Sequence, residues 1–240
     1  MKVLRISPIS ALRCAISNAD SFAALQSAVL LARDHLGLDD LSYRWFNAPG
    51  KPVSVQTYSQ AWIDWYLSTG QDRSNPIARS LIHEFETRNW KSLYLNDHMA
   101  REFLAQSSAH GLSPQALSVP IHGPHGEFAI LSAHMECDDN AWAIFVADRR
   151  PDIELIARDF HMQARRLTAA EHNQPRALTP REIDVISLIA RGLSRAKAAQ
   201  RLNISEHTLR DHLRSARVKL GATSTIHAVA RAVADGTVVV

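Results

Sequence analysis

The last sixty or so residues, about the length of one small helical domain, constrain the fold most strongly, because they divide into four short segments that each follow a helix-capping residue. Thr179 precedes Pro180 and has Glu182 three residues further on, which is the pattern of a capping box. The other three segments each begin at a serine, whose hydroxyl can cap a helix: Ser194, Ser205 and Ser224. The sequence therefore predicts four short helices, with only a three-residue turn between the second and the third.

The third segment, SEHTLRDHLRSARVKL (205–220), has two chemically different faces. At 100° per residue, four apolar side chains share the face that must pack on the first two helices: Leu209, Leu213, Ala216 and Leu220. The opposite face and its flanks carry four Lys or Arg and two His. Two helices joined by a short turn, the second long and basic, form a helix-turn-helix pattern that fits double-stranded DNA.

Charge is unevenly divided along the chain. From Thr179 onward, ten Lys and Arg stand against five Asp and Glu, whereas the first 178 residues hold seventeen against nineteen. A basic tail behind a mildly acidic body predicts that only the tail meets a polyanion. On the last helix, four apolar residues form a stripe suited to contact between two copies on DNA, so we expect a homodimer: Ile226, Val229, Ala230 and Val233.

Other classes of protein are not indicated by the sequence. Cys14 and Cys137 are the only cysteines, too few for a disulfide framework or a thiolate metal site. The uncharged run 21–32 is short and partly polar, so it fits a helix better than a membrane span or a signal sequence. We find no catalytic carboxylate pair, nucleophile motif or phosphate loop. We expect a cytoplasmic protein with no catalytic residues, no metal site and no membrane partner.

The first 167 residues mix helical and strand patterns. Helices are predicted at 21–36, 60–69, 75–88 and 151–167, and strands at 41–46, 53–58 and 141–147. Residues 117–135 predict a hairpin around the glycine-rich turn HGPHG. Hairpins without regular βα alternation favour an α+β chain whose amino-terminal domain is an α/β/α sandwich. This domain would span residues 1–167, followed by a linker at 168–177 and an all-α four-helix domain at 178–240.

The stretch WIDWYLSTGQDRSNP (62–76) is unusually aromatic for a chain with 7% aromatic residues. Tyr58, Trp62 and Tyr66 recur at steps of four, which places them on one side of a helix. Asn75 and Pro76 have the identities of an N-cap and a first helical residue. Buried aromatics are most often plain core, so the spacing by itself leaves both a core and a pocket possible.

The tail resembles the LuxR-type helix-turn-helix domain. The TPRE opening, Gly192, the NIS turn, Thr208, His212 and the KLGA ending are all in register, although Ile186 and Lys197 depart from the common residues. The resemblance implies base contacts in the major groove from Arg210, Asp211 and Arg214. It also makes four residues candidates for phosphate contacts: Arg217, Lys219, Ser224 and Thr225.

Residues ~20–166 resemble the N-acyl-homoserine-lactone-binding domain of quorum-sensing regulators. Tyr58, Trp62, Tyr66, Pro76 and Trp90 have the family's identities at the family's spacing. The resemblance implies that Trp62 donates its indole N–H to the lactone carbonyl and that Tyr58 donates to the amide carbonyl. It further implies that Tyr66 and Trp90 pack on the ligand, and that Ser132 bonds its polar groups.

Two positions depart from the family. Asn75 stands where the family has a carboxylate that accepts the ligand's amide N–H, and Gln115 or Ala116 replaces a glycine. Asn75 could accept through its oxygen, more weakly than a carboxylate, or donate through its amide nitrogen. The effector is therefore an acyl-homoserine lactone, another small molecule, or none.

Our interpretation is a ligand-responsive transcriptional regulator of the quorum-sensing type. Two alternatives stay open. The first is a ligand-independent regulator, or an anti-activator acting through heterodimers. The second is a small-molecule-binding or enzymatic domain with a vestigial tail. A phosphorylated receiver domain is not favoured, because Asp39 and Asp40 precede a strand instead of following one.

Overall fold

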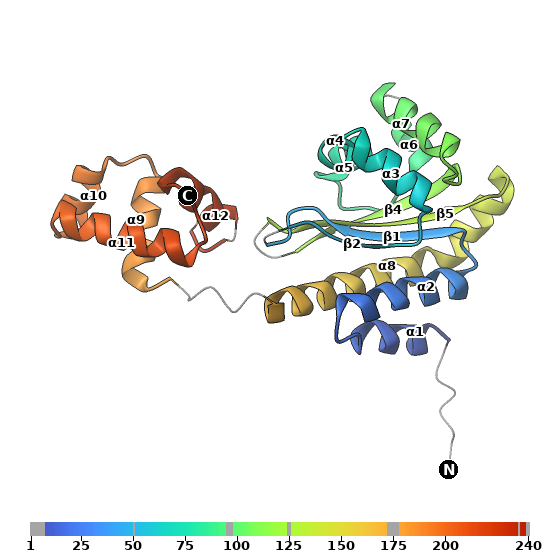
Figure 1. Cartoon of the computed structure of the whole chain (residues 1–240), viewed down its shortest axis with the longest axis horizontal. Coiled ribbons are helices and arrows are strands. Elements are labelled where there is room, and N and C mark those ends of the chain that lie inside the picture. Colours follow the sequence, from blue (N-terminus) through green and yellow to red (C-terminus); the bar gives the residue numbers. More distant parts are fainter. Residues whose placement is uncertain are drawn as a thin grey trace, which may run out of the picture. The chain divides into compact units, whose positions relative to one another are not determined.

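The computed structural model describes residues 8–49, 51–94, 98–123, 126–171, 178–234 and 236–238. The chain divides into two compact units, one built mainly from residues up to Thr168 and the other mainly from Ala169 onward. Both units contain helices, and the first also contains a sheet (Figure 1).

The first unit is built on a five-stranded antiparallel sheet with the order β2-β1-β5-β4-β3. Its strands are β1 (Asp40–Trp45), β2 (Val53–Gln56), β3 (Arg88–Asn89), β4 (Gln115–His122) and β5 (Phe128–Met135). The predicted hairpin is confirmed by the pairing of β4 with β5. Part of its HGPHG turn, residues 124–125, lies outside the described residues.

Helices cover both faces of this sheet, which confirms the α/β/α sandwich (Figure 1). One face carries α1 (Pro8–Ser17), α2 (Phe22–Leu36) and α8 (Asp139–Glu171). The other carries α3 (Gln60–Ser68), α4 (Gln71–Ser74), α5 (Pro76–Leu81), α6 (Trp90–Tyr94) and α7 (His98–Ala109). Each face has its own apolar core, with Tyr43 and Phe160 in the first and Trp62 and Phe103 in the second.

The predicted strand at 141–147 is wrong, because these residues form the start of α8, a helix of 33 residues that passes through Pro151. Asp138 accepts the Ala141 N–H at 2.8 Å and so caps this helix. A strand here could not pair with β5, which already has β1 and β4 as neighbours. Helix α8 continues to Glu171, into the segment predicted as linker, while residues 172–177 lie outside the described part.

The predicted helix at 75–88 is only partly correct. It ends at Leu81, and the chain then turns and adds the two-residue strand β3 to the edge of β4. The Asn89 side chain accepts the Lys91 N–H at 3.0 Å, which starts a new helix at Trp90. Strand pairing and a second cap therefore overrule the helical pattern.

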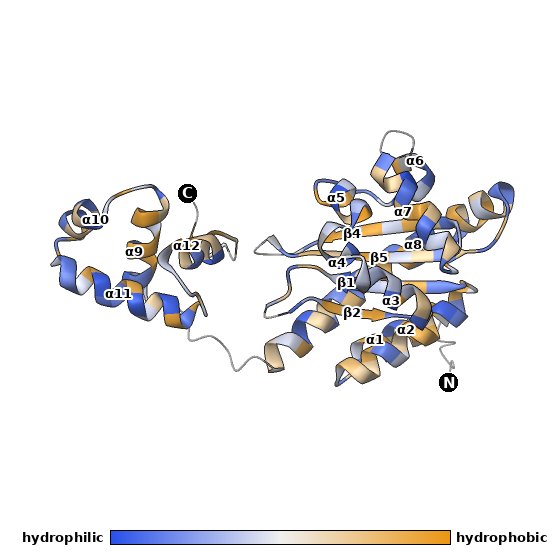
Figure 2. Cartoon of the chain, turned by 45° about the horizontal axis from the view of Figure 1, so that its top comes forward, coloured by the Kyte–Doolittle hydropathy of each residue, from blue (hydrophilic) through white to orange (hydrophobic). Residues whose placement is uncertain are grey.

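The second unit contains the four predicted helices: α9 (Pro180–Ala190), α10 (Arg195–Leu202), α11 (Glu206–Lys219) and α12 (Thr225–Ala234). The capping box of Thr179 and Glu182 is present, and the three serine hydroxyls each accept a backbone N–H at the start of their helices. Asn203 adopts the left-handed conformation, φ 52°, that the tight turn between α10 and α11 requires. Helix α11 is mostly hydrophilic, whereas α9 carries more hydrophobic residues (Figure 2).

Candidate ligand pocket and DNA-reading helix

Three aromatic rings form a continuous row at the start of α3, in which Trp62 is stacked on Tyr66 and tilted against Tyr58. Ser59 caps the helix by accepting the Trp62 N–H at 3.2 Å, and this sets the spacing of the side chains that follow. The Tyr58 and Trp62 ring centroids are 4.4 Å apart, and those of Trp62 and Tyr66 are 4.7 Å apart. Trp65 stacks on His110 and also meets the Trp62 ring edge-on, with centroids 6.0 Å apart, but it does not line the pocket.

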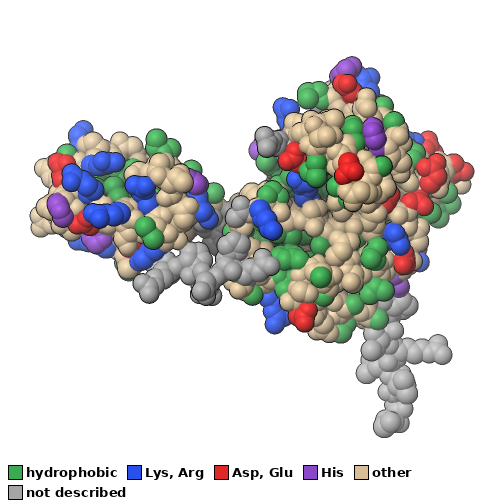
Figure 3. All heavy atoms as spheres, in the orientation of Figure 1, with side chains coloured by type: hydrophobic (Ala, Val, Ile, Leu, Met, Phe, Trp, Pro, Cys, Tyr) green, Lys and Arg blue, Asp and Glu red, His purple; other side chains and the backbone are tan. Residues whose placement is uncertain are grey.

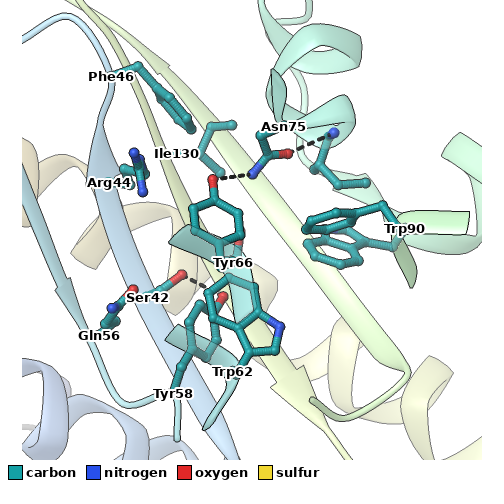
Figure 4. A pocket seen from close by; sticks show the side chains of 13 residues that line it. Ser42, Arg44, Phe46, Gln56, Tyr58, Trp62, Tyr66, Asn75, Trp90 and Ile130 are labelled. Atoms are coloured by element: carbon teal, nitrogen blue, oxygen red, sulfur yellow. Dashed lines mark hydrogen bonds between the residues drawn. The ribbon is translucent and has the colours of Figure 1, made fainter. Parts of the chain in front are cut away.

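The six residues predicted to bind a ligand line one pocket between this row and the sheet (Figure 4). The pocket has a cavity volume of about 40 Å³, within a space of about 460 Å³ that is partly open to solvent. Its predicted lining residues are Tyr58, Trp62, Tyr66, Asn75, Trp90 and Ser132. Sequence reasoning missed the rest of the lining: Ser42, Arg44, Phe46, Gln56, Ile77, Phe103 and Ile130.

Most of the missed residues reach the pocket through strand register. Ser42 on β1 lies directly opposite Gln56 on β2 and Ser132 on β5, so these three side chains point to the same face. Arg44 lies opposite Ile130 in the next position that points to this face. The alternation within β1 is visible in the sequence, but its partners on β5 are not.

The Trp62 indole N–H is buried and has no hydrogen-bond partner among the described residues. Indole nitrogen can only donate, and a buried donor without an acceptor is costly. An acceptor supplied by a bound molecule would remove that cost.

Asn75 connects the pocket wall to the start of α5. Its Oδ1 accepts the backbone N–H groups of Ile77 at 2.9 Å and Ala78 at 3.1 Å, as predicted for an N-cap. Its Nδ2 donates to the Tyr66 hydroxyl at 3.0 Å. In Figure 4 the Asn75 side chain bridges Tyr66 and the helix beside the space that Trp62 and Trp90 border.

The Tyr58 hydroxyl has two partners within the chain, His134 and Ser42. It lies 3.0 Å from His134 Nε2, and the other ring nitrogen, Nδ1, lies 3.4 Å from the Ser113 carbonyl. Burial lowers the His134 pKa to about 4, so the ring is neutral and donates from Nδ1 to that carbonyl. Tyr58 therefore donates to His134 and accepts from Ser42 at 2.7 Å, so its donation to a ligand would have to compete with His134.

Ser132 lies at the end of a short hydrogen-bonded chain. Trp90 Nε1 donates to Ser118 at 2.8 Å, and the Ser118 and Ser132 oxygens are 2.6 Å apart. Ser118 is fully buried and, in the described structure, can donate a hydrogen bond only to Ser132. This leaves the Ser132 proton able to point into the pocket.

Arg44 adds a cation to the lining. Its guanidinium carbon lies 5.3 Å from the centre of the Phe46 ring and 5.4 Å from that of Tyr66. Its Nε–H is buried without a partner in the part of the chain that the structure describes, and one terminal nitrogen makes a long 3.5 Å contact with the Asp72 carbonyl.

Helix α11 presents the three predicted base-contacting residues on its exposed face. Arg214 donates to Asp211 at 2.8 Å, and Asp211 also pairs with His207 at 3.0 Å. Arg210 is exposed beside them. Lys and Arg side chains gather on the face of this unit shown in Figure 3. The geometry is compatible with the predicted role of this face.

Two residues predicted to contact phosphate also have partners within the unit. Lys219 donates to Glu182 at 2.7 Å, and their side chains are only 18% and 4% exposed. Burial alone would raise the Glu182 pKa, but hydrogen bonds that include those from Lys219 and Thr179 hold it at about 2. Arg217 donates to the Thr223 carbonyl at 2.8 Å. The phosphate contact of Lys219 stays a prediction, and a phosphate would have to compete with Glu182 for its ammonium group.

The last two predicted phosphate contacts lie at the start of α12. The Ser224 hydroxyl accepts the His227 N–H at 3.0 Å, and Thr225 is half-buried.

Within the described ranges, no group of three or more His, Cys, Asp or Glu is placed to hold a metal ion. In the same ranges, no helix has the length and apolar character needed to cross a bilayer.

Comparison with known proteins assigns both units. Residues 21–164 match the family described as "Autoinducer binding domain", and residues 176–232 match "Bacterial regulatory proteins, luxR family". The chain is 27% identical over 176 residues to the transcriptional activator protein RaiR of Rhizobium etli, covering 72% of each chain. It is 26% identical over 208 residues to VanR of Vibrio anguillarum, covering 82% of this chain and 81% of that protein.

The fold is also similar to a solved structure. The crystal structure of Escherichia coli SdiA matches with a TM-score of 0.72 at 19% identity, covering 95% of this chain and 96% of that chain. The chain belongs to the LuxR family of bacterial regulatory proteins and is a transcriptional regulator of the quorum-sensing type, with an autoinducer-binding domain and a DNA-binding domain.

Proposed function

We propose that the pocket binds an acylated small molecule, an N-acyl-homoserine lactone or a related compound, and that its occupancy controls DNA binding. The buried Trp62 N–H carries this proposal, because it has no acceptor among the described residues. A carbonyl placed at this atom would pair it, and an unpaired buried donor costs about 1–3 kcal/mol. The apolar lining from Phe46, Ile77 and Phe103 suits the acyl chain.

On the DNA side, Arg210, Asp211 and Arg214 would contact base edges, with arginine pairing to guanine and aspartate accepting from cytosine. One helix-turn-helix unit buries too little surface for specific binding at cellular salt. The regulator would therefore act as a homodimer on two half-sites about one helical turn apart.

A ligand-independent regulator is the second candidate. It is supported by the internal hydrogen bonds of the pocket: Tyr58 with His134, Asn75 with Tyr66, and Trp90 with Ser118. Because these groups already have partners, the first unit could fold around an empty pocket.

Substituting Trp62 distinguishes the two candidates. Trp62→Phe keeps a ring between Tyr58 and Tyr66 but removes the N–H, so ligand affinity should fall roughly threefold to tenfold. Trp65→Phe is the matched control, because Trp65 is in the same helix but outside the lining. The measurement is a reporter and a thermal shift of the purified protein, each titrated with a panel of acyl-homoserine lactones and related acylated compounds. Full reporter activity without any ligand, unchanged in Trp62→Phe, would favour the ligand-independent regulator.

A further inference from the structure

Both polar atoms of the Asn75 side chain have fixed roles. The oxygen accepts two backbone N–H groups at the start of α5, and the nitrogen donates to the Tyr66 hydroxyl. The reverse orientation is excluded, because it would turn the amide nitrogen toward the N–H groups of Ile77 and Ala78. The hydrogen-bond network therefore determines which atom faces the pocket wall.

A carboxylate at this position would behave differently. One of its oxygens could cap α5 while the other accepted a hydrogen bond from a ligand N–H. Asn75 has a single oxygen, and two N–H groups already occupy it. Its second amide hydrogen has no acceptor among the described residues. Asn75 consequently offers a ligand a donor and no acceptor.

The neighbouring polar groups also offer the ligand hydrogen-bond donors. Within the described part of the chain, the Tyr66 hydroxyl accepts from Asn75 and its own proton has no acceptor. The Nε–H of Arg44 and the indole N–H of Trp62 are buried without partners. A ligand N–H placed among these groups would give up its bond to water and meet other donors, whereas a ligand oxygen would be met by several donors.

We infer that the pocket selects a ligand with an oxygen where an acyl-homoserine lactone has its amide N–H, that is, an acyl ester in preference to an acyl amide. This inference rests on the proposed function, since it names the chemical class of the acylated molecule that the pocket binds. Trp62 then donates to one carbonyl, and Asn75 and Tyr66 donate to the ester oxygens.

Matched ligand pairs test the inference directly. N-acyl-homoserine lactones and α-acyloxy-γ-butyrolactones differ only by oxygen in place of N–H, and both are titrated into the full chain by calorimetry with acyl chains of four to twelve carbons. The wild type should bind the ester on the order of tenfold more tightly than its amide partner. Asn75→Asp should reverse the preference, because its second carboxylate oxygen can accept the amide N–H while the first keeps the cap.

Asn75→Ser is the control variant, because serine also caps a helix but presents no amide to the ligand. It should bind the two ligands within about threefold of one another. If Asn75→Asp does not fold, the contrast between the wild type and Asn75→Ser still decides the matter. An amide preference in the wild type that Asn75→Asp leaves unchanged would overturn the ligand class and leave the pocket intact. Binding of neither ligand by any variant would overturn the proposed function together with the ligand class.

Discussion

The ligand pocket and the DNA-reading helix use polar side chains in opposite ways. In the pocket, buried partners fix which atom donates and which accepts, as at Asn75 and Tyr58. On α11, Arg214 is 72% exposed and, among the residues that the structure describes, pairs only with Asp211, a neighbour on the same helix. Such a surface pair contributes little to stability, so both side chains can turn toward a new partner.

This contrast separates two kinds of specificity. In the pocket, we expect that exchanging one atom of Asn75 changes the chemistry of the ligand that fits. On α11, we expect position on the helix and total charge to matter more than any internal hydrogen bond. Lys219 is the exception, because it lies on α11 but has a mostly buried partner, Glu182.

The largest effect on stability should come from Lys219. Lys219→Met leaves the Glu182 carboxylate buried without its counter-charge, which should cost on the order of 3 kcal/mol in the second unit. All five tryptophans belong to the first unit, so fluorescence follows that unit alone while circular dichroism follows both. Lys219→Met should lower the thermal transition seen only by circular dichroism. Arg214→Met is the matched control, with an expected change in the free energy of unfolding within about 0.5 kcal/mol. Equal losses of stability in both variants would contradict the difference between the buried and the exposed ion pair.

The two units should lose stability in different ranges of pH. The folded-state pKa of His134 is about 4, below its ordinary value of 6.5, so the unfolded state takes up the proton first. The free energy of unfolding of the first unit should therefore fall as the pH drops from 6.5 to 4. For one proton, the loss is about 1.4 kcal/mol for each pH step of one. Burial also lowers the pKa of His161, which therefore acts in the same direction. Denaturation followed by tryptophan fluorescence should show a smaller slope in His134→Gln than in the wild type, and an identical slope would refute the assignment.

The second unit should respond only at lower pH. Glu182 has a pKa of about 2 in the folded state against an ordinary 4.5, so its contribution is complete above pH 4.5 and is lost between 4.5 and 2. Circular dichroism across this range measures the loss. If the second unit instead melted between pH 6.5 and 4, Glu182 would not be the group responsible.

Arg214→Ala should weaken DNA binding without affecting folding. Loss of one bidentate base contact should cost about 1–3 kcal/mol at the cognate site and relax the preference at one base pair. Binding to the cognate site and to random DNA is compared at one salt concentration. Equal weakening on both would show that Arg214 contacts phosphate and that this face of α11 does not read bases.

The smallest effect concerns the dimer. Ile226 is 83% exposed, whereas Val229, in the same predicted stripe, packs against the core of the second unit. Ile226→Asp should therefore test association without disturbing the fold. It should cost about 1 kcal/mol, roughly fivefold, at a full two-half-site operator and nothing at a single half-site. Unchanged affinity for the full operator would remove α12 from the dimer contact.

The second unit could be predicted almost completely from local signals. The caps at Thr179, Ser194 and Ser205 and the left-handed Asn203 determine where its helices begin and end. These interactions span three or four residues, so they are visible in the sequence. The ion pair of Lys219 with Glu182 was missed because it joins helices 37 residues apart.

The pocket was predictable only in part, for a related reason. The aromatic row depends on helical spacing, and the sequence shows it. Ser42, Arg44 and His134 reach the pocket or its hydrogen bonds through the register of β1 and β5, which nothing local determines. The strand predicted at 141–147 failed similarly, because a short apolar run does not reveal whether a sheet has a free edge beside it.

The central claim is that the pocket beneath Trp62 holds an acylated small molecule. Native mass spectrometry of the full chain, purified from its own host, tests it most directly. We predict one bound small molecule per chain, released on denaturation and carrying an acyl chain, with reduced occupancy in Trp62→Phe and full occupancy in Trp65→Phe. A protein that binds its operator with no small molecule attached, in the wild type and both variants, would contradict the claim.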